Sequence, residues 1–173
     1  MDKIFRINMT DLTVKVEPVP EAWAGLGGRA LTSTIVAAEV PPTCHALGPN
    51  NKLVFAPGLL SGTAASNAGR FSCGAKSPLT GGIKECSAGG TSSRIIARLG
   101  IKAIIIEGQP AGDTWYELIV GKEGVEFRPE TETLGMGTFE VVEKVAARHG
   151  EDFGVITLGQ AGEHLMAISN ISV

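Results

Sequence analysis

The feature that most constrains this chain is a glycine-rich stretch at residues 58–90. Glycines, alanines and small hydroxyl residues there surround a few isolated cations, including Arg70 and Lys76. Such side chains cannot fill a core, and glycine loses more conformational freedom on folding than any other residue. The backbone must therefore be held by flanking elements or by a bound group. We expect short strands at residues 71–75 and 82–86 within it.

Two interpretations of this stretch are open. Glycines commonly serve turns between strands, where they adopt positive φ. A connection normally needs only about 2–6 residues, however, and long irregular segments inside compact domains tend to carry function. Bare backbone N–H groups beside Arg and Lys suit a phosphate-bearing anion. The stretch is therefore a candidate binding site.

The composition indicates one globular domain with an aliphatic core. The chain has 173 residues, of which 43% are hydrophobic and 5% are aromatic, and this length suits one domain better than two. The net charge of −3 provides no basic face for nucleic acid. Apolar runs such as residues 104–106 are too short to span a bilayer, and no leader peptide is recognisable. We expect a cytoplasmic protein with neither nucleic acid nor membrane as partner.

The sequence offers no motif that could catalyse a reaction or bind a metal alone. Cys44, Cys73 and Cys86 are widely spaced, which argues against a zinc site or a cluster held wholly within the chain. Cys73 and Cys86 lie in the glycine-rich stretch, so a thiolate or redox role stands beside the alternative that they are small packed residues. His149 is expected to interact with a helix dipole rather than to catalyse. We therefore assign no catalytic residue and no metal ligand.

Two small-residue loops precede expected helices. Residues 25–30 fit the letters of a dinucleotide fingerprint, G-x-G-x-x-A, but such a loop directly follows a buried strand and precedes an acidic residue about 20 positions later. Neither condition holds, so we expect a plain helix N-terminus, at which Arg29 could still bind an anion. Residues 89–93 open a helix that ends near residue 100. Its free N–H groups favour an anion, although Ser and Thr in such positions commonly act as caps.

Hydrophobic periodicity predicts the remaining elements. The expected strands are residues 3–8, 12–17, 52–57, 102–107, 115–120, 125–128, 153–158 and 165–171, and the expected helices are residues 29–39 and 138–149. A tight turn is expected at residues 159–163, and we recognise no internal repeat. This order predicts an α+β fold rich in β-structure, with antiparallel sheets and a few helices.

Several short motifs, taken in order and at their spacings, resemble the N-terminal domain of the tungsten-dependent aldehyde ferredoxin oxidoreductases. The resemblance runs essentially from end to end, and Lys-Ser-Pro-Leu-Thr-Gly at residues 76–81 carries it most specifically. The other matching pieces are residues 5–8, 26–29, 51–53, 56–58, 61–63, 69–70, 87–90, 104–108 and 159–163.

The resemblance implies a binding site for a cofactor. In that family this domain is a β-rich base, two antiparallel sheets with helices, on which a tungsten bis-pyranopterin lies. The resemblance implies that Arg70 lies between the pterin and a [4Fe–4S] cluster. Many members carry Asn where this chain has Ser87, so a side-chain bond to the pterin is expected to become a water-mediated one. The expected cofactor-binding residues are Arg70, Lys76, Ser87, Ala88, Gly89 and Gly90.

The resemblance also implies that further segments complete the enzyme. In the family an Arg-Ala-Ala-Gly-Arg-Gly-Gly segment follows a few residues beyond the equivalent of Val173. Two larger domains then carry the cluster cysteines, further pterin motifs and the substrate channel. Residues 1–173 are therefore expected to form a single base domain that lacks its last segment and the C-terminal domains.

These implications predict the cofactor-cradling part of a tungsten or molybdenum pterin, iron–sulfur oxidoreductase. Such an enzyme oxidises aldehydes to carboxylic acids with ferredoxin as acceptor. The expected partners are the rest of the enzyme, ferredoxin and further copies in a homo-oligomer, and the isolated chain is expected to be inactive. The alternative is a non-catalytic module that binds a small molecule or a partner protein through residues 58–90.

Overall fold

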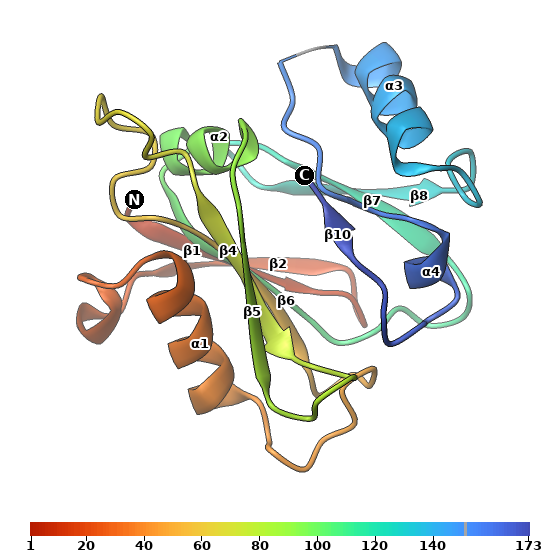
Figure 1. Cartoon of the computed structure of the whole chain (residues 1–173), viewed down its shortest axis with the longest axis horizontal. Coiled ribbons are helices and arrows are strands. Elements are labelled where there is room, and N and C mark those ends of the chain that lie inside the picture. Colours follow the sequence, from red (N-terminus) through yellow and green to blue (C-terminus); the bar gives the residue numbers. More distant parts are fainter. Residues whose placement is uncertain (151) are drawn as a thin grey trace.

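A computed structural model describes residues 1–150 and 152–173 of the chain. Six strands form one sheet in the order β2-β1-β6-β3-β4-β5, and two further sheets contain β7-β8 and β10-β9 (Figure 1). The strands are β1 (Lys3–Asn8), β2 (Thr13–Pro18), β3 (Lys52–Pro57), β4 (Phe71–Lys76), β5 (Ile83–Ala88), β6 (Ile101–Glu107), β7 (Trp115–Val120), β8 (Val125–Glu130), β9 (Thr157–Leu158) and β10 (Ile171–Ser172). The helices are η1 (Glu21–Trp23), α1 (Gly28–Glu39), α2 (Ser92–Arg98), α3 (Thr138–His149) and α4 (Gln160–Glu163).

β6 lies between β1 and β3 in the six-stranded sheet. It pairs parallel with β1 and antiparallel with β3, and all other strand pairs in the described residues are antiparallel. Its sequence is an almost continuous apolar run with five buried residues at its start, as is typical of a strand covered on both faces. The predicted α+β class, with mainly antiparallel pairing and few helices, is confirmed.

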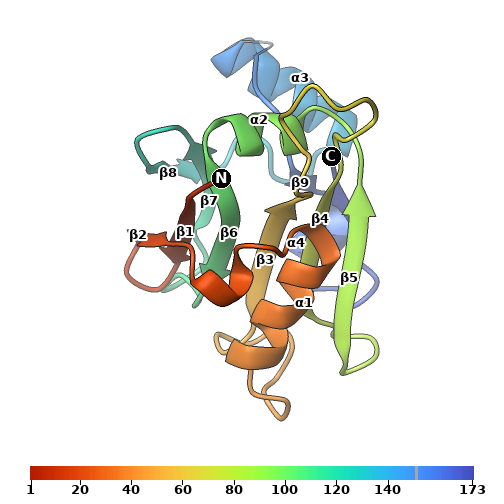
Figure 2. The same cartoon turned by 90° about the vertical axis from the view of Figure 1, so that its left-hand side faces the viewer.

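Apolar side chains pack on both faces of this sheet. Successive residues of a strand point to opposite faces, and β3 shows this directly. Val54 packs with Leu31 and Ile35 of α1, which lies against β3, β4 and β5 (Figure 2). Phe55 instead packs with Phe71 in a second cluster, which residues of β7 and β8 and the C-terminal segment cover. The sheet therefore separates α1 from the second half of the chain.

The close approach of α1 to β4 depends on Gly74. A Cβ atom built on Gly74 would lie 2.6 Å from Cβ of Thr32 and 2.9 Å from its Oγ1, and Thr32 is fully buried. The φ of Gly74 lies outside the left-handed region. Gly74 therefore provides space for the helix rather than an unusual backbone conformation.

A cluster of charges connects the end of α1 to the sheet. The Arg6 guanidinium donates from Nη1 to Oε2 of Glu39 at 2.8 Å and from Nη2 to Oε1 at 3.1 Å, which is a bidentate ion pair. Lys52 Nζ lies 3.1 Å from Oε2 of Glu39 and also contacts Glu107. Burial disfavours the charged form of Glu39, but the hydrogen bonds from Arg6 and Lys52 outweigh it and lower the pKa of Glu39.

The C-terminal segment differs from its sequence prediction. The strand predicted at residues 153–158 is wrong except for β9, and the strand predicted at 165–171 is replaced by the two-residue β10. The expected turn at 159–163 contains the short helix α4. Phe153 and Leu165 are 43% and 63% exposed. Their apolar character suggested buried strands, but strand formation requires a neighbouring strand to pair with, and these positions have none in the described part of the chain.

We expect Gly74→Ala to lower the free energy of unfolding by about 1–3 kcal/mol, because the added methyl group would displace Thr32 and α1. Urea unfolding followed by circular dichroism measures this. Gly25→Ala is the matched control, since a Cβ built on Gly25 meets nothing within 4 Å. Equal losses in the two variants would contradict the close-packing role of Gly74.

We expect the free energy of unfolding to fall as the pH drops below 4.5, the ordinary pKa of Glu39. A carboxylate whose pKa is lowered in the folded state stabilises the fold above its unfolded pKa, and protonation removes that contribution. Glu39→Gln should therefore lower stability at neutral pH and weaken the acid dependence, as measured by urea unfolding across the acidic range. Glu21→Gln, at an exposed position, should change neither; an unchanged acid dependence in Glu39→Gln would refute this account.

Candidate functional site

The glycine-rich stretch forms an edge hairpin preceded by a looped segment. β4 and β5 pair antiparallel at the edge of the six-stranded sheet, so the two strands predicted there are confirmed and are slightly longer than expected. Phe71 pairs with Ala88, which places Arg70 and Gly89 at the same end of the hairpin. The register therefore brings together residues that are far apart in the sequence.

Arg70 is held against Ser87 at this end of the hairpin. Its Nε donates to Ser87 Oγ at 3.4 Å and its Nη2 donates to the Ser87 carbonyl oxygen at 3.3 Å. Both residues are exposed, as are Gly89 and Gly90. Arg70 forms no salt bridge within residues 1–150 and 152–173, and a Cβ built on Gly89 meets nothing within 4 Å. In the part of the chain that the structure describes, the hairpin end therefore presents a cation without an acidic partner beside open backbone.

Buried serines hold the segment that leads to Arg70. Gly58 N donates to the Arg70 carbonyl at 2.9 Å. The Ser61 hydroxyl lies 3.0 Å from the same carbonyl and 2.8 Å from that of Ala68, and it accepts from Ser93 Oγ at 3.0 Å. The backbone of Arg70 is thus fixed from inside the protein while its side chain remains at the surface. Sequence reasoning placed Ser61 in a family motif without finding this role, because the contact joins the loop to α2.

Lys76 lies at the opposite end of the hairpin from Arg70. Its ammonium group donates to the carbonyl oxygens of Pro42 and Cys44, and the latter distance is 2.7 Å. Asn51 accepts from the Lys76 backbone N–H at 3.0 Å. Of the six residues predicted for the site, the structure therefore brings together Arg70 with residues 87–90 and places Lys76 apart from them.

The small residues at the start of α2 pack inside the protein. Thr91 is the N-cap residue but makes no side-chain capping hydrogen bond, so the expected cap is wrong. Ser92 and Ser93 are buried at 3% and 0% exposure, and Ser93 donates to Ser61. The Ser93 hydroxyl therefore joins α2 to the loop that contains Ser61.

Arg29, Cys73 and Cys86 all have protein neighbours in the fold. Arg29 Nε donates to Glu85 Oε2 at 2.6 Å, and α1 follows the short helix η1 rather than a strand, as expected for a plain helix start. Cys73 and Cys86 are direct neighbours in the β4–β5 register and both are free thiols. Burial, with smaller contributions from Cys86 and Glu85, raises the pKa of Cys73 to about 12, which disfavours a thiolate.

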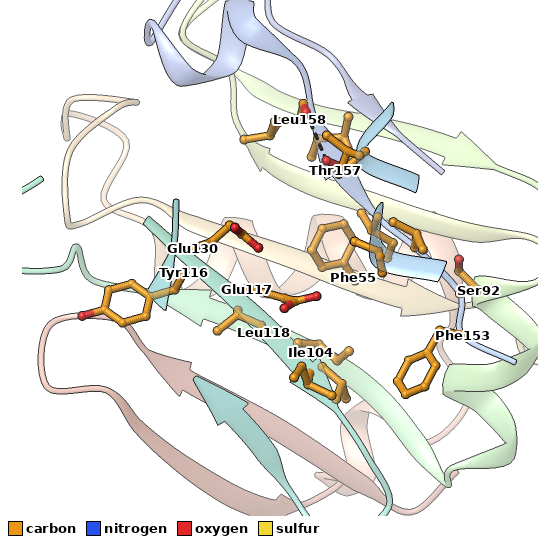
Figure 3. Close-up of a pocket in the computed structure, with 18 of the residues that line it drawn as sticks. Phe55, Ser92, Ile104, Tyr116, Glu117, Leu118, Glu130, Phe153, Thr157 and Leu158 are labelled. Atoms are coloured by element: carbon orange, nitrogen blue, oxygen red, sulfur yellow. Dashed lines mark hydrogen bonds between the residues drawn. The ribbon is translucent and has the colours of Figure 1, made fainter. Parts of the chain in front are cut away.

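A cavity of about 620 Å³ lies between the six-stranded sheet and the second half of the chain. Figure 3 shows Phe55 and Ile104 from the sheet facing it, with Leu118 of β7 and Leu158 of β9 among the other residues of its wall. Four residues with carboxylate side chains also line it, Glu117, Glu130, Asp152 and Glu163. Of these, Glu117 and Glu130 are paired with Arg148 at 2.8 and 2.6 Å. The cavity is otherwise mainly apolar.

His149 extends this ion-pair group from the end of α3. Its Nε2 lies 3.0 Å from Oε1 of Glu117, so it joins the network rather than standing alone at the helix terminus. Burial disfavours ionisation of Glu130, but the hydrogen bond from Arg148 outweighs it and lowers the pKa of Glu130. Among the described residues, no group of three or more His, Cys, Asp or Glu side chains is arranged to hold a metal, and no helix is long and apolar enough to cross a membrane.

The comparisons with known proteins place the chain among the N-terminal domains of oxidoreductases. Residues 4–173 match the family described as "Aldehyde ferredoxin oxidoreductase, N-terminal domain". The chain therefore belongs to the aldehyde ferredoxin oxidoreductase family, and the resemblance found in its sequence is confirmed.

Individual relatives extend this comparison. The chain is 36% identical to the tungsten-containing aldehyde ferredoxin oxidoreductase of Pyrococcus abyssi, over 94% of the chain and 27% of that protein. It is 31% identical to that of Pyrococcus furiosus, over 98% of the chain and 28% of that protein. A solved structure, the active site complex BamBC of benzoyl coenzyme A reductase in complex with 1,5-dienoyl-CoA, matches with a TM-score of 0.91 and 25% identity, over 99% of the chain and 26% of its own. The chain thus spans less than a third of these proteins.

We expect Ser61→Ala to destabilise the protein by about 1–2 kcal/mol, because the buried hydroxyl of Ser93 and two carbonyls lose a partner. Faster hydrogen exchange at residues 62–70 should accompany the loss, as measured by mass spectrometry. Ser66→Ala, at an exposed position of the same loop, is the control. Unchanged exchange in Ser61→Ala would show that the loop is held by other contacts.

Proposed function

We propose that this chain is the cofactor-cradling part of a tungsten or molybdenum pterin, iron–sulfur oxidoreductase that oxidises aldehydes to carboxylic acids with ferredoxin as acceptor. Its family and the tungsten-containing relatives support this proposal. The observation that carries it is the end of the β4–β5 hairpin. There Arg70 is oriented by Ser87 and has open backbone beside it at Gly89.

The residues at this end of the hairpin fit a pterin cofactor. Such a cofactor carries phosphate and amide edges, which call for cations and for backbone N–H groups that can approach closely. Arg70 would donate to an anionic or carbonyl edge, Ser87 would exchange a hydrogen bond directly or through water, and residues 88–90 would contribute backbone. When bound, the metal pterin would supply the two-electron oxidation of the aldehyde. The chain's own residues bind and orient it.

Lys76 would contribute at a different place. Because its ammonium group holds the carbonyls of Pro42 and Cys44, it would fix the loop beyond α1 rather than meet the same edge of the cofactor as Arg70. One end of the hairpin, with Arg70, would then bind the ligand. The other end, with Lys76, would stabilise the fold.

The proposal includes parts that lie outside this chain. We expect residues 1–173 to form one base domain, with the [4Fe–4S] ligands, the metal-binding motifs and the substrate channel on other segments of the enzyme. Ferredoxin as partner, a homo-oligomeric assembly and a cytoplasmic location belong to the same proposal. The isolated chain should be inactive, and aldehyde-dependent dye reduction by it would contradict this proposal.

A second candidate reaction is the reduction of an aromatic coenzyme A thioester. The similarity to the benzoyl coenzyme A reductase complex, which covers 99% of the chain, favours it as the alternative. The two reactions differ in substrate and in the direction of electron flow. Assays of the complete enzyme with aldehydes and with an aromatic acyl-CoA would therefore distinguish them.

We expect Arg70→Ala to weaken the binding of a pterin phosphate to this chain at least tenfold, because one hydrogen bond to a charged group contributes about 1.5–3 kcal/mol. The probe is the oxidised, fluorescent pterin phosphate that tungsten and molybdenum pterin enzymes release on denaturation. Fluorescence anisotropy measures its dissociation constant.

Arg128→Ala is the control for this experiment, since it removes the same charge from β8, away from the hairpin. Similar binding by Arg70→Ala and by the unmodified chain would contradict the proposal that Arg70 binds the cofactor. Equal weakening by both variants would show a general charge effect instead of a site.

A further inference from the structure

Cys73 and Cys86 lie directly opposite each other on the two strands of the β4–β5 hairpin. Residues that are opposite in an antiparallel pair point to the same face of the sheet. The charge of a Cys86 thiolate contributes to the raised pKa of Cys73, which agrees with two neighbouring sulfur atoms. Cys44 instead packs with the apolar cluster on the α1 face of the sheet, whereas Cys73 packs with the cluster on the other face. The fold therefore brings two of the three cysteines together and keeps the third apart.

The register of the hairpin sets the separation of the two cysteines. The backbone N–H of Ser77 donates to the carbonyl oxygen of Gly82 at 2.8 Å, so these residues form a hydrogen-bonded pair. Hydrogen-bonded and non-hydrogen-bonded pairs alternate along an antiparallel ladder, and Cys73 lies four residues before Ser77. Cys73 and Cys86 are therefore also a hydrogen-bonded pair, whose Cα atoms are about 5.5 Å apart. The commonest Cα separation in disulfides is about 5.5–6 Å.

A disulfide at this position would require a small movement of the hairpin. Cβ atoms of opposite residues lie about 4.5–5.5 Å apart, and disulfides bring them to about 3.5–4.5 Å, so the strands must approach by about 1 Å. The neighbours of Cys73 on β4, Ser72 and Gly74, are small. In the part of the chain that the structure describes, β5 pairs with β4 alone. An edge strand can make such a movement, and a strained, exposed disulfide is readily reduced again.

The two thiols differ in their access to a soluble oxidant. Cys86 is exposed on the edge strand, whereas Cys73 is half-buried between Phe55 of β3 and Cys86 of β5. The pKa of Cys73, raised to about 12 mainly by burial, makes it a poor nucleophile toward a molecule in solution. A soluble oxidant therefore meets Cys86 first. An accessible cysteine beside a second one that can resolve its oxidised form is the usual arrangement of a redox-sensitive pair.

We propose that Cys73 and Cys86 form a reversible disulfide by exchange with a small soluble disulfide. The Cys86 thiolate attacks one sulfur of the small disulfide, which forms a mixed disulfide on Cys86 and releases one small thiolate. The Cys73 sulfur then attacks the Cys86 sulfur, and the mixed S–S bond breaks as the second small thiolate leaves. The protons of the two cysteines pass to the released thiolates. The cysteine pair loses two electrons, and the small disulfide is reduced to two thiols.

The bond would form next to the contact that orients Arg70. Cys86 directly precedes Ser87, whose hydroxyl and carbonyl oxygens accept the hydrogen bonds of Arg70. A covalent link between β4 and β5 at this point would fix the register that brings Arg70 to Ser87. The inference goes beyond the proposed function and does not depend on pterin binding.

The test uses oxidised glutathione as the small disulfide. The reduced, folded chain is incubated with it, free thiols are blocked, and peptide mass spectrometry maps every cysteine. We expect a Cys73–Cys86 disulfide within one molecule and a free thiol at Cys44, and dithiothreitol should restore all three thiols. In Cys73→Ser a stable glutathione adduct should accumulate on Cys86. In Cys86→Ser the Cys73 thiol should be lost at least tenfold more slowly than in the unmodified chain.

Cys44→Ser is the matched control, because it removes a thiol from the other side of the sheet and should leave the yield of the disulfide unchanged. A glutathione adduct that persists on Cys86 in the unmodified chain would overturn the proposal, since Cys73 would then not resolve it. Equal loss of the Cys73 thiol with and without Cys86 would also overturn it. A link between Cys86 residues of two molecules, increasing with protein concentration, would do the same.

Discussion

The structure depends on the insertion of β6 between β1 and β3. These strands come from distant parts of the sequence, and β6 satisfies the backbone groups on the facing edges of both. Ile101 and Ile105 on β6 are fully buried, and each buried aliphatic side chain contributes about 1.5–3 kcal/mol before the entropy of ordering is subtracted. Without β6 the N-terminal hairpin and the glycine-rich hairpin would not share one sheet.

The small residues of the glycine-rich stretch allow close packing at some positions and leave open space at others. Gly74 lets α1 approach β4, and Gly62, with φ of +80°, lies where a Cβ would be 3.0 Å from Cβ of Ala97. At the far end Gly89 has open space. One stretch thus combines close packing against α1 and α2 with accessible backbone at the open end of the hairpin, where Arg70 is held by Ser87.

Membership in the aldehyde ferredoxin oxidoreductase family agrees with a stretch that packs tightly in one part and exposes its backbone in another. The chain spans less than a third of its relatives, and a protein of closely similar fold belongs to a benzoyl coenzyme A reductase complex. A base that presents backbone and one oriented cation can serve different reactions, because the reacting groups would come from other segments. The proposed function therefore assigns binding and orientation to this chain, and chemistry to the cofactor.

The sequence by itself determined the elements whose side chains carry a clear period: the two hairpins, α1, α3 and the buried β6. Its motifs also identified the family. It did not determine the end of the chain, where Phe153 and Leu165 are apolar and yet exposed, because pairing decides whether such a segment becomes a strand. Only the tertiary structure brought Arg70 to Ser87 and separated Lys76 from them. These relations are set by strand register and by contacts between distant segments, which local periodicity does not encode.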